Sequence, residues 1–272
     1  MIRTRLLLAV LTFALSAGVA QGHEFWIDPV EFTVDVGDPI VADLRVGEAY
    51  LGGAQSYLPN RFRRFEIVQG AATAPVDGRM GDRPALNQTA DEGLAVLVHV
   101  TTDSRLTYQE FAKFASFVTH KDAPWTIAEH SARNLPQEGF VEVYSRYAKS
   151  LVAVGDGAGS DRVVGLETEI VAQTNPYTDD LSDGMIVTLY YQGAPRADAQ
   201  IEIFEKNPSG EVAVSTLRTD AAGVARVPVR AGHRYMLDSV VLRAPDIAAP
   251  SDGDPVWESL WANLTFEVPE AP

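Results

Sequence analysis

The sequence predicts a mainly β protein made of two β-sandwich-like domains, the first with a helical insertion and the second immunoglobulin-like or transthyretin-like. Three observations support this prediction. Short apolar runs with alternating polar residues recur along most of the 272-residue chain, which is typical of strands. Helical spacing is confined to residues 107–133. After residue 183, six strand-like runs follow at short intervals, as in a small sandwich domain.

The first predicted domain, residues 23–172, opens with strands. Apolar residues alternate with polar ones in "FTVDV" and "IVADLRV", and the break at Gly37 and Asp38 predicts a turn. The stretch at 70–93 is polar and rich in turn residues, so it is predicted as loop. The predicted strands before the insertion span 32–36, 40–46, 63–69 and 94–100.

The insertion at 107–133 is predicted to hold two helices. Thr107 followed by Glu110 has the spacing of a capping box, and aromatic residues recur at helical spacing in "TYQEFAKFASFV". The first helix is therefore predicted to start near Thr107 and to end before Pro124. Proline favours the first turn of a helix, so a second short helix is predicted directly after it. The aromatic stripe is expected to pack on a sheet.

Strands return after the insertion. The runs at 140–155 and 163–173 complete the first domain. An Asn-Pro pair followed by acidic turn residues predicts a linker at 173–182. The second domain, residues 183–272, is predicted as a β-sandwich. Its six predicted strands span 185–193, 199–206, 212–220, 223–229, 234–243 and 262–268.

Composition excludes several kinds of function. The formal net charge of −15 disfavours binding to nucleic acid and to anionic lipid, and it mildly favours cations. The absence of cysteine excludes a disulfide scaffold, thiolate metal sites and cysteine catalysis. The sequence contains no nucleophile elbow, no paired-histidine zinc motif and no glycine-rich phosphate loop. We therefore expect that the protein is not an enzyme.

The first twenty residues predict a signal peptide. Arg3 and Arg5 precede an apolar run at 6–17, and small residues follow up to Ala20. The run is too short to span a bilayer, and no later segment reaches the roughly 18 consecutive apolar residues that a spanning helix needs. We therefore expect export to the periplasm, removal of residues 1–20, and no stable insertion into the membrane.

The new amino terminus carries the clearest chemical signal. Cleavage after Ala20 would leave Gln21-Gly22-His23, whose amine, two backbone amides and imidazole can surround one cation in a plane. Four nitrogen donors in a square suit Ni(II) and Cu(II). Cleavage after Gly22 would put His23 first, and its amine and imidazole would then form a chelate. Cyclisation of Gln21 would remove the amine and weaken the first chelate. Either cleavage makes His23 the first predicted metal ligand.

Two further histidines are candidate second ligands. His120 and His130 lie ten residues apart, which is not a ligand spacing on one helix, and they converge if the chain reverses at Pro124. His99 lies in an apolar strand and His233 at a turn, so both are expected to be structural. The predicted metal ligands are His23, His120 and His130.

Several motifs resemble a known family. The run "HEFWIDPVEF" from His23, the strand "VYSRYAKSLVAVG" and the Asn-Pro-Tyr linker are similar to exported domain-of-unknown-function proteins that are described as the periplasmic component of nickel or cobalt uptake. The closing segments "TDAAGVARVPV", "GHRYMLDSVVL" and "VWESLWANLTFEV" are similar as well, so the likeness covers nearly all of the mature chain. The resemblance implies an exported, β-rich, metal-associated protein. Its matched residue with a chemical rationale for metal is His23.

The leading functional hypothesis is a periplasmic metal-binding accessory protein. It would hold nickel or cobalt, or copper, at His23 and pass the ion to a membrane transporter. A copper-dependent oxidase that uses an amino-terminal histidine ranks last. In the "YSRYAK" strand, Arg146 can either orient a carboxylate or pair with a nearby acid of the chain.

The alternative hypothesis is a non-catalytic β-sandwich module that binds a carbohydrate, a peptide or a partner protein. Sandwich domains serve such functions often, and the fold alone does not decide between them. The four tryptophans are either contacts for such a ligand or core residues: Trp26, Trp125, Trp257 and Trp261.

Overall fold

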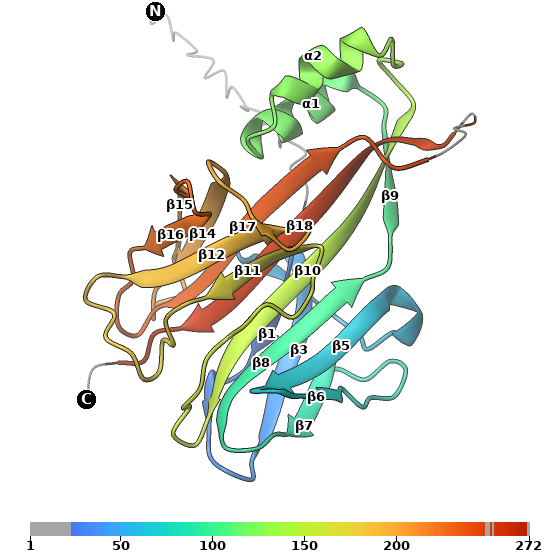
Figure 1. Ribbon diagram of the computed structural model, residues 1–272. Coiled ribbons are helices and arrows are strands. Elements are labelled where there is room, and N and C mark those ends of the chain that lie inside the picture. The colour runs from blue at the N-terminus through green and yellow to red at the C-terminus, as the bar shows by residue number, and fades with distance from the viewer. Residues whose placement is uncertain (1–22, 248–250, 252, 271–272) are drawn as a thin grey trace, which may run out of the picture.

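The computed structural model describes residues 23–247, 251 and 253–270. It confirms a mainly β, sandwich-like protein with several sheets, and it places two short helices, α1 (Phe111–His120) and α2 (Trp125–Ala132), among these residues (Figure 1). Neither helix of this described part has the length and apolarity that crossing a membrane requires. The predicted signal peptide at 1–20, with its cleavage after Ala20 or Gly22, lies outside the described residues.

A ten-stranded sheet forms the middle layer. Its two longest strands, β10 (Phe140–Val154) and β18 (Pro255–Glu267), lie side by side and parallel, with Arg146 opposite Trp261. The other strands are β2 (Thr33–Val34), β5 (Phe62–Gln69), β6 (Ala72–Pro75), β8 (Gly93–Thr101), β9 (Ser104–Tyr108), β14 (Gln200–Lys206), β15 (Val212–Arg218) and β17 (Arg234–Arg243). The strand order is β15-β14-β17-β18-β10-β8-β5-β6, and β2 and β9 also pair with β10.

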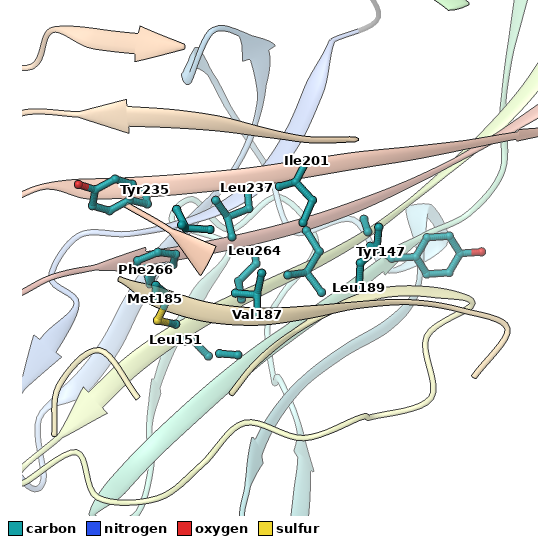
Figure 2. Close-up of a cluster of buried hydrophobic side chains, with 14 of the residues drawn as sticks. Tyr147, Leu151, Met185, Val187, Leu189, Ile201, Tyr235, Leu237, Leu264 and Phe266 are labelled. Atoms are coloured by element: carbon teal, nitrogen blue, oxygen red, sulfur yellow. The ribbon is translucent and has the colours of Figure 1, made fainter. Parts of the chain in front are cut away.

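One face of this sheet packs against a smaller sheet. Because side chains alternate between the two faces of a strand, Leu94 and Val96 of β8 face this layer, whereas Ala95 and Leu97 face the opposite one. The smaller sheet contains β11 (Thr168–Ala172), β12 (Met185–Tyr191), β13 (Ala194–Pro195) and β16 (Val224–Val227). Figure 2 shows the core between the layers, which includes Met185, Val187, Leu189, Leu237 and Leu264.

The opposite face is covered by a third sheet and by the helices. Ile27 of this third sheet packs in one core with Leu97 of the middle layer. The helices lie over the far end of the same face (Figure 1), where Phe117 of α1 stacks on Trp261 at a ring distance of 5.7 Å. The expected packing of the aromatic stripe onto a sheet is thus confirmed. The third sheet contains β1 (Glu24–Pro29), β3 (Pro39–Glu48), β4 (Leu51–Gln55) and β7 (Leu86–Thr89).

The middle sheet contains strands from both segments that the sequence assigns to separate domains. β10 belongs to residues 23–172 and β18 to residues 183–272, yet the two are hydrogen-bonded neighbours. The segment predicted as a linker, 173–182, is also tied to the fold, since the amide of Asn175 donates to the carbonyls of Gly157 and Gly159. The division into two domains therefore stays a prediction, and the described residues share one central sheet.

The first helix begins later than predicted. Thr107 lies in β9 opposite Val141 of β10, and the cap of α1 is Glu110, without a side-chain hydrogen bond. The capping-box prediction at Thr107 was therefore wrong, because antiparallel pairing with β10 holds that residue in a strand. The second helix starts directly after Pro124, as predicted.

Candidate functional site

A row of polar side chains crosses the helix-bearing face of the middle sheet. Glu202 of β14 lies opposite Asp238 of β17, and Asp238 lies opposite Asn263 of β18. All three side chains are buried. Residues opposite one another on neighbouring strands point to the same face, so the sheet register alone gathers these groups. Asp238 Oδ1 and both polar atoms of the Asn263 amide have no hydrogen-bond partner among the described residues.

The ammonium group of Lys121 lies at the centre of this polar region. The residue follows α1 and is buried, with its Nζ 3.2 Å from Glu24 Oε1 and 3.1 Å from Asp238 Oδ2. The same Nζ donates a hydrogen bond to Glu202 and lies 4.8 Å from the ring centroid of Trp261. Burial on its own would lower the pKa of Lys121, but the three carboxylates outweigh it and raise that pKa. Lys121 therefore stays charged.

The acids of the cluster differ in their electrostatics. Burial raises the pKa of Asp238 to about 7 despite its bond with Lys121. Burial also acts to raise the pKa of Glu202, but hydrogen bonds from His120 and Lys121 outweigh it and lower that pKa. His120 Nε2 lies 2.8 Å from Glu202 Oε1, and this hydrogen bond raises the pKa of His120. The cluster thus balances buried acids against cations supplied by the chain itself.

Glu24, Glu202 and Asp238 are the one group of three possible metal-ligand side chains within the described residues. Their carboxylate oxygens lie close enough together to coordinate one ion. The Lys121 ammonium, however, bonds to all three and supplies the positive charge that a metal ion would bring. Buried charges need such a partner, so in this structure the cluster is an internal ion network.

The three predicted metal ligands are not brought together. His23 is exposed and directly precedes β1, with Nδ1 3.6 Å from Glu48 Oε1. His120 bonds to Glu202 as described above. His130 is fully buried, where its Nδ1 accepts from Trp257 Nε1 at 3.0 Å and its Nε2 bonds to the carbonyl of Pro136 at 2.9 Å. Since both ring nitrogens are engaged, His130 is a packing residue here and offers no donor to a metal.

A pocket of about 330 Å³ opens beside His23. Its walls come from β9 and the turn before α1, from α1 itself, and from β10 and β18. Arg146 of β10 links the pocket to the segment before β1, because its Nη2 donates to the carbonyl of His23 at 2.9 Å. Aromatic rings form much of the lining: Tyr108, Phe117, Tyr144 and Trp261.

Glu142 is the acid of this pocket. Its carboxylate accepts hydrogen bonds from Tyr108 Oη at 2.7 Å and from Ser259 Oγ, and Trp261 Nε1 donates to the same Ser259 hydroxyl at 2.9 Å. Burial raises the pKa of Glu142 to about 7, against the lowering effect of these two donors. The carboxyl group therefore changes protonation state near neutral pH.

Replacing Glu142 with glutamine should remove a pH-dependent loss of stability. A carboxyl whose pKa rises from 4.5 when unfolded to about 7 when folded favours folding in its protonated form. The wild type should therefore lose stability relative to Glu142→Gln as pH rises from about 4.5 to about 7, by roughly 1–3 kcal/mol. Urea unfolding of both proteins at pH 5 and pH 8 measures this change. Asp238 titrates in both proteins, so its contribution cancels from the comparison. If the difference in unfolding free energy between the two proteins is the same at pH 5 and pH 8, the prediction is wrong.

Sequence reasoning missed most of this site. It selected His23 and His120, but not the acids or the lysine between them. A signal was present in the strands, where Glu202 and Asp238 interrupt the apolar runs "IEIF" and "YMLDSVV". A charged residue inside a buried strand requires a partner, and the sequence gives no indication that this partner is Lys121.

Comparison with known proteins places the chain in a family. The curated proteins contain no match. A family model described as a domain of unknown function, DUF4198, matches residues 20–242. The matched region includes His23, Lys121, Arg146 and the three acids of the cluster. Because the match extends over most of the 272 residues, the chain belongs to the domain-of-unknown-function family DUF4198.

Proposed function

We propose that this protein is an exported, non-enzymatic metal-binding protein that holds a nickel or cobalt ion, or copper, at His23. The observation that carries the proposal is the position of this side chain. Its imidazole is exposed, and Nδ1 lies 3.6 Å from the Glu48 carboxylate. The backbone is also held, since Arg146 bonds to the His23 carbonyl and the next residue, Glu24, bonds to Lys121. The His23 imidazole and the Glu48 carboxylate therefore lie close together at a fixed position on the surface.

The donor set suits the proposed ions. Imidazole nitrogen is a common ligand for nickel, cobalt and copper, and a carboxylate can complete the coordination. Removal of a signal peptide after Ala20 or Gly22 would add a terminal amine within two residues of His23. The net charge of −15 raises the local concentration of cations. The buried acids contribute no site of their own, because the Lys121 ammonium already pairs with all three.

In this proposal the protein acts in the periplasm and delivers its ion to a membrane transporter. An exposed site suits transfer, because the ion can be reached by a partner without unfolding the carrier. The resemblance to proteins described as periplasmic components of nickel or cobalt uptake supports the same role. The protein's part is to bind and release the ion.

Replacing His23 with alanine should abolish tight metal binding and leave the fold intact. We expect the affinity for Ni(II) to fall on the order of 100-fold, and Glu48→Gln to cause a smaller loss. Titration calorimetry of the exported protein with nickel, cobalt and copper salts measures this. His233→Gln is the matched control, because that histidine lies beside Glu205, away from the site.

Native mass spectrometry of the same samples reports the cleavage position and the number of ions bound. An alanine variant that binds nickel, cobalt and copper as tightly as the wild type would refute the proposal.

A second candidate function is a binding module for a small organic molecule. The pocket beside His23 favours it, since pockets of roughly 300–1,000 Å³ with apolar walls and a few polar groups are typical of ligand sites. Of the four tryptophans, Trp261 lines this pocket and Trp125 is exposed. Trp26 and Trp257 are buried core residues.

A further inference from the structure

Arg146 is a cation without an acidic partner. Among the described residues, no carboxylate lies within the 4.0 Å that defines an ion pair with its guanidinium. Its Nη2 bonds to a backbone carbonyl, and its buried Nε has no hydrogen-bond partner. By contrast, Arg243 of β17 holds both Glu167 and Glu258. The pairing of Arg146 with an acid of the chain, one of the two interpretations of the sequence, is therefore not found.

The surrounding charges leave Arg146 available. Glu24 and Asp238 act on it only through space, because both carboxylates bond to Lys121. Glu142 also acts on it only through space, because its carboxylate bonds to Tyr108 and Ser259. A partly buried guanidinium that lacks an anion is unfavourable. Such a group at a pocket wall is a ready site for a carboxylate, which matches its planar set of N–H donors.

Aromatic and aliphatic side chains form much of the remaining pocket wall. Arg146 lies over the face of the Tyr144 ring, 4.6 Å from its centroid. Phe117 and Trp261 stack on each other at the same pocket, and Leu106 of β9 adds an aliphatic side chain. Stacked aromatic rings favour a planar apolar ligand.

The one acidic side chain in the lining need not repel an anion. Burial raises the pKa of Glu142 to about 7, so the carboxyl is largely neutral at lower pH. Its oxygens accept hydrogen bonds from Tyr108 and Ser259. Lys113 of α1 also lines the pocket, but its ammonium lies 3.6 Å from Glu110 Oε1. The charge that Arg146 brings to the pocket is therefore the one complementary to a small anion.

We propose that this pocket binds a small organic carboxylate with a planar, apolar body. Its carboxylate pairs with the Arg146 guanidinium, and its body packs against Phe117 and Trp261. The inference deepens the second candidate function, gives its ligand class, and does not require a metal ion at His23.

The test uses three aryl carboxylates as probes: benzoate, phenylacetate and indole-3-acetate. Binding to the whole exported protein is measured by calorimetry and by ligand-observed NMR, with EDTA present so that metal at His23 plays no part. The corresponding amides, which have the same shape without the charge, are the matched ligands. At least one acid should bind, and its amide should bind about tenfold more weakly or not at all.

Substitutions at two residues locate the site. Arg146→Gln should weaken binding of the acid by about tenfold or more, and Arg146→Lys should recover part of the loss. Leu106→Asp places a negative charge on the pocket wall at a side chain that is 43 % exposed, so it should repel the probe without disturbing the core. Arg63→Gln, at an arginine that pairs with Asp103, is the control and should bind like the wild type.

Three results would overturn the proposal. One is that none of the three acids binds at millimolar concentration. Another is that acid and amide bind equally well, which would remove the role of the charge. The third is that folded Arg146→Gln or Leu106→Asp binds the acid as tightly as the wild type. Since EDTA is present throughout, a failure here is distinct from a failure of metal binding at His23.

Discussion

Replacing Lys121 with methionine should lower the free energy of unfolding by about 3–5 kcal/mol. The substitution removes the one ammonium that bonds to Glu24, Glu202 and Asp238, and it leaves those carboxylates buried. Methionine fills a similar volume, so the loss reports the missing charge rather than a cavity. For a protein of this size, the melting temperature should fall by roughly 6–20 °C. Calorimetric or circular-dichroism melting measures the change.

The pH dependence separates this explanation from a packing defect. In the wild type burial raises the pKa of Asp238 to about 7, although Lys121 acts to lower it. Without the lysine that pKa rises further, so the variant loses more stability than the wild type as pH rises through about 7. The deficit of Lys121→Met should therefore be larger at pH 8 than at pH 5. Adding Asp238→Asn to the variant should restore part of the stability. Lys113→Met, at a half-exposed residue, is the control and should change the unfolding free energy little. A Lys121→Met protein whose unfolding free energy lies within about 1 kcal/mol of the wild type would contradict the prediction.

Lys149 is expected to be the second residue whose loss is severe. It lies on the other face of β10, fully buried, with Nζ 2.7 Å from Asp161 Oδ1 and 3.1 Å from Glu169 Oε1. Replacing it with methionine leaves two buried carboxylates without their cation. The expected loss is about 3–5 kcal/mol of unfolding free energy. Chemical unfolding in urea measures it.

The location of the damage should distinguish this variant from the one at Lys121. Asp161 also accepts from the backbone amide of Ala172, and Glu169 from those of Val164 and Leu166. Lys149→Met should therefore increase hydrogen exchange in residues 155–172. Lys121→Met should instead increase exchange in α1. Equal exchange across the whole chain in both variants would argue against separate local roles for the two lysines.

Much of the architecture was predictable because the pattern of apolar and polar residues along a strand shows which of its faces are buried. The alternating and continuous apolar runs identified β3, β5, β8, β10 and most strands of the second half within a few residues, but β18 begins at Pro255, seven residues before the predicted start. The aromatic stripe and Pro124 identified both helices. The start of α1 was not predictable, because pairing with β10 kept Thr107 in β9, and such non-local hydrogen bonds are invisible to local spacing.

The amino-acid sequence by itself determined the mainly β class, the helical insertion and the exclusion of thiolate chemistry, and it identified His23 as a candidate metal ligand. The tertiary structure alone decided which charges meet. Glu24, Lys121, Glu202 and Asp238 come from four distant elements, and only the sheet register and the packing of α1 place them together. The same packing engaged both nitrogens of His130 and left Arg146 without an acid among the residues that the structure describes. The physical reason is that a buried charge or ring nitrogen takes its partner from whatever the fold brings within a few ångströms, and sequence spacing does not record that distance.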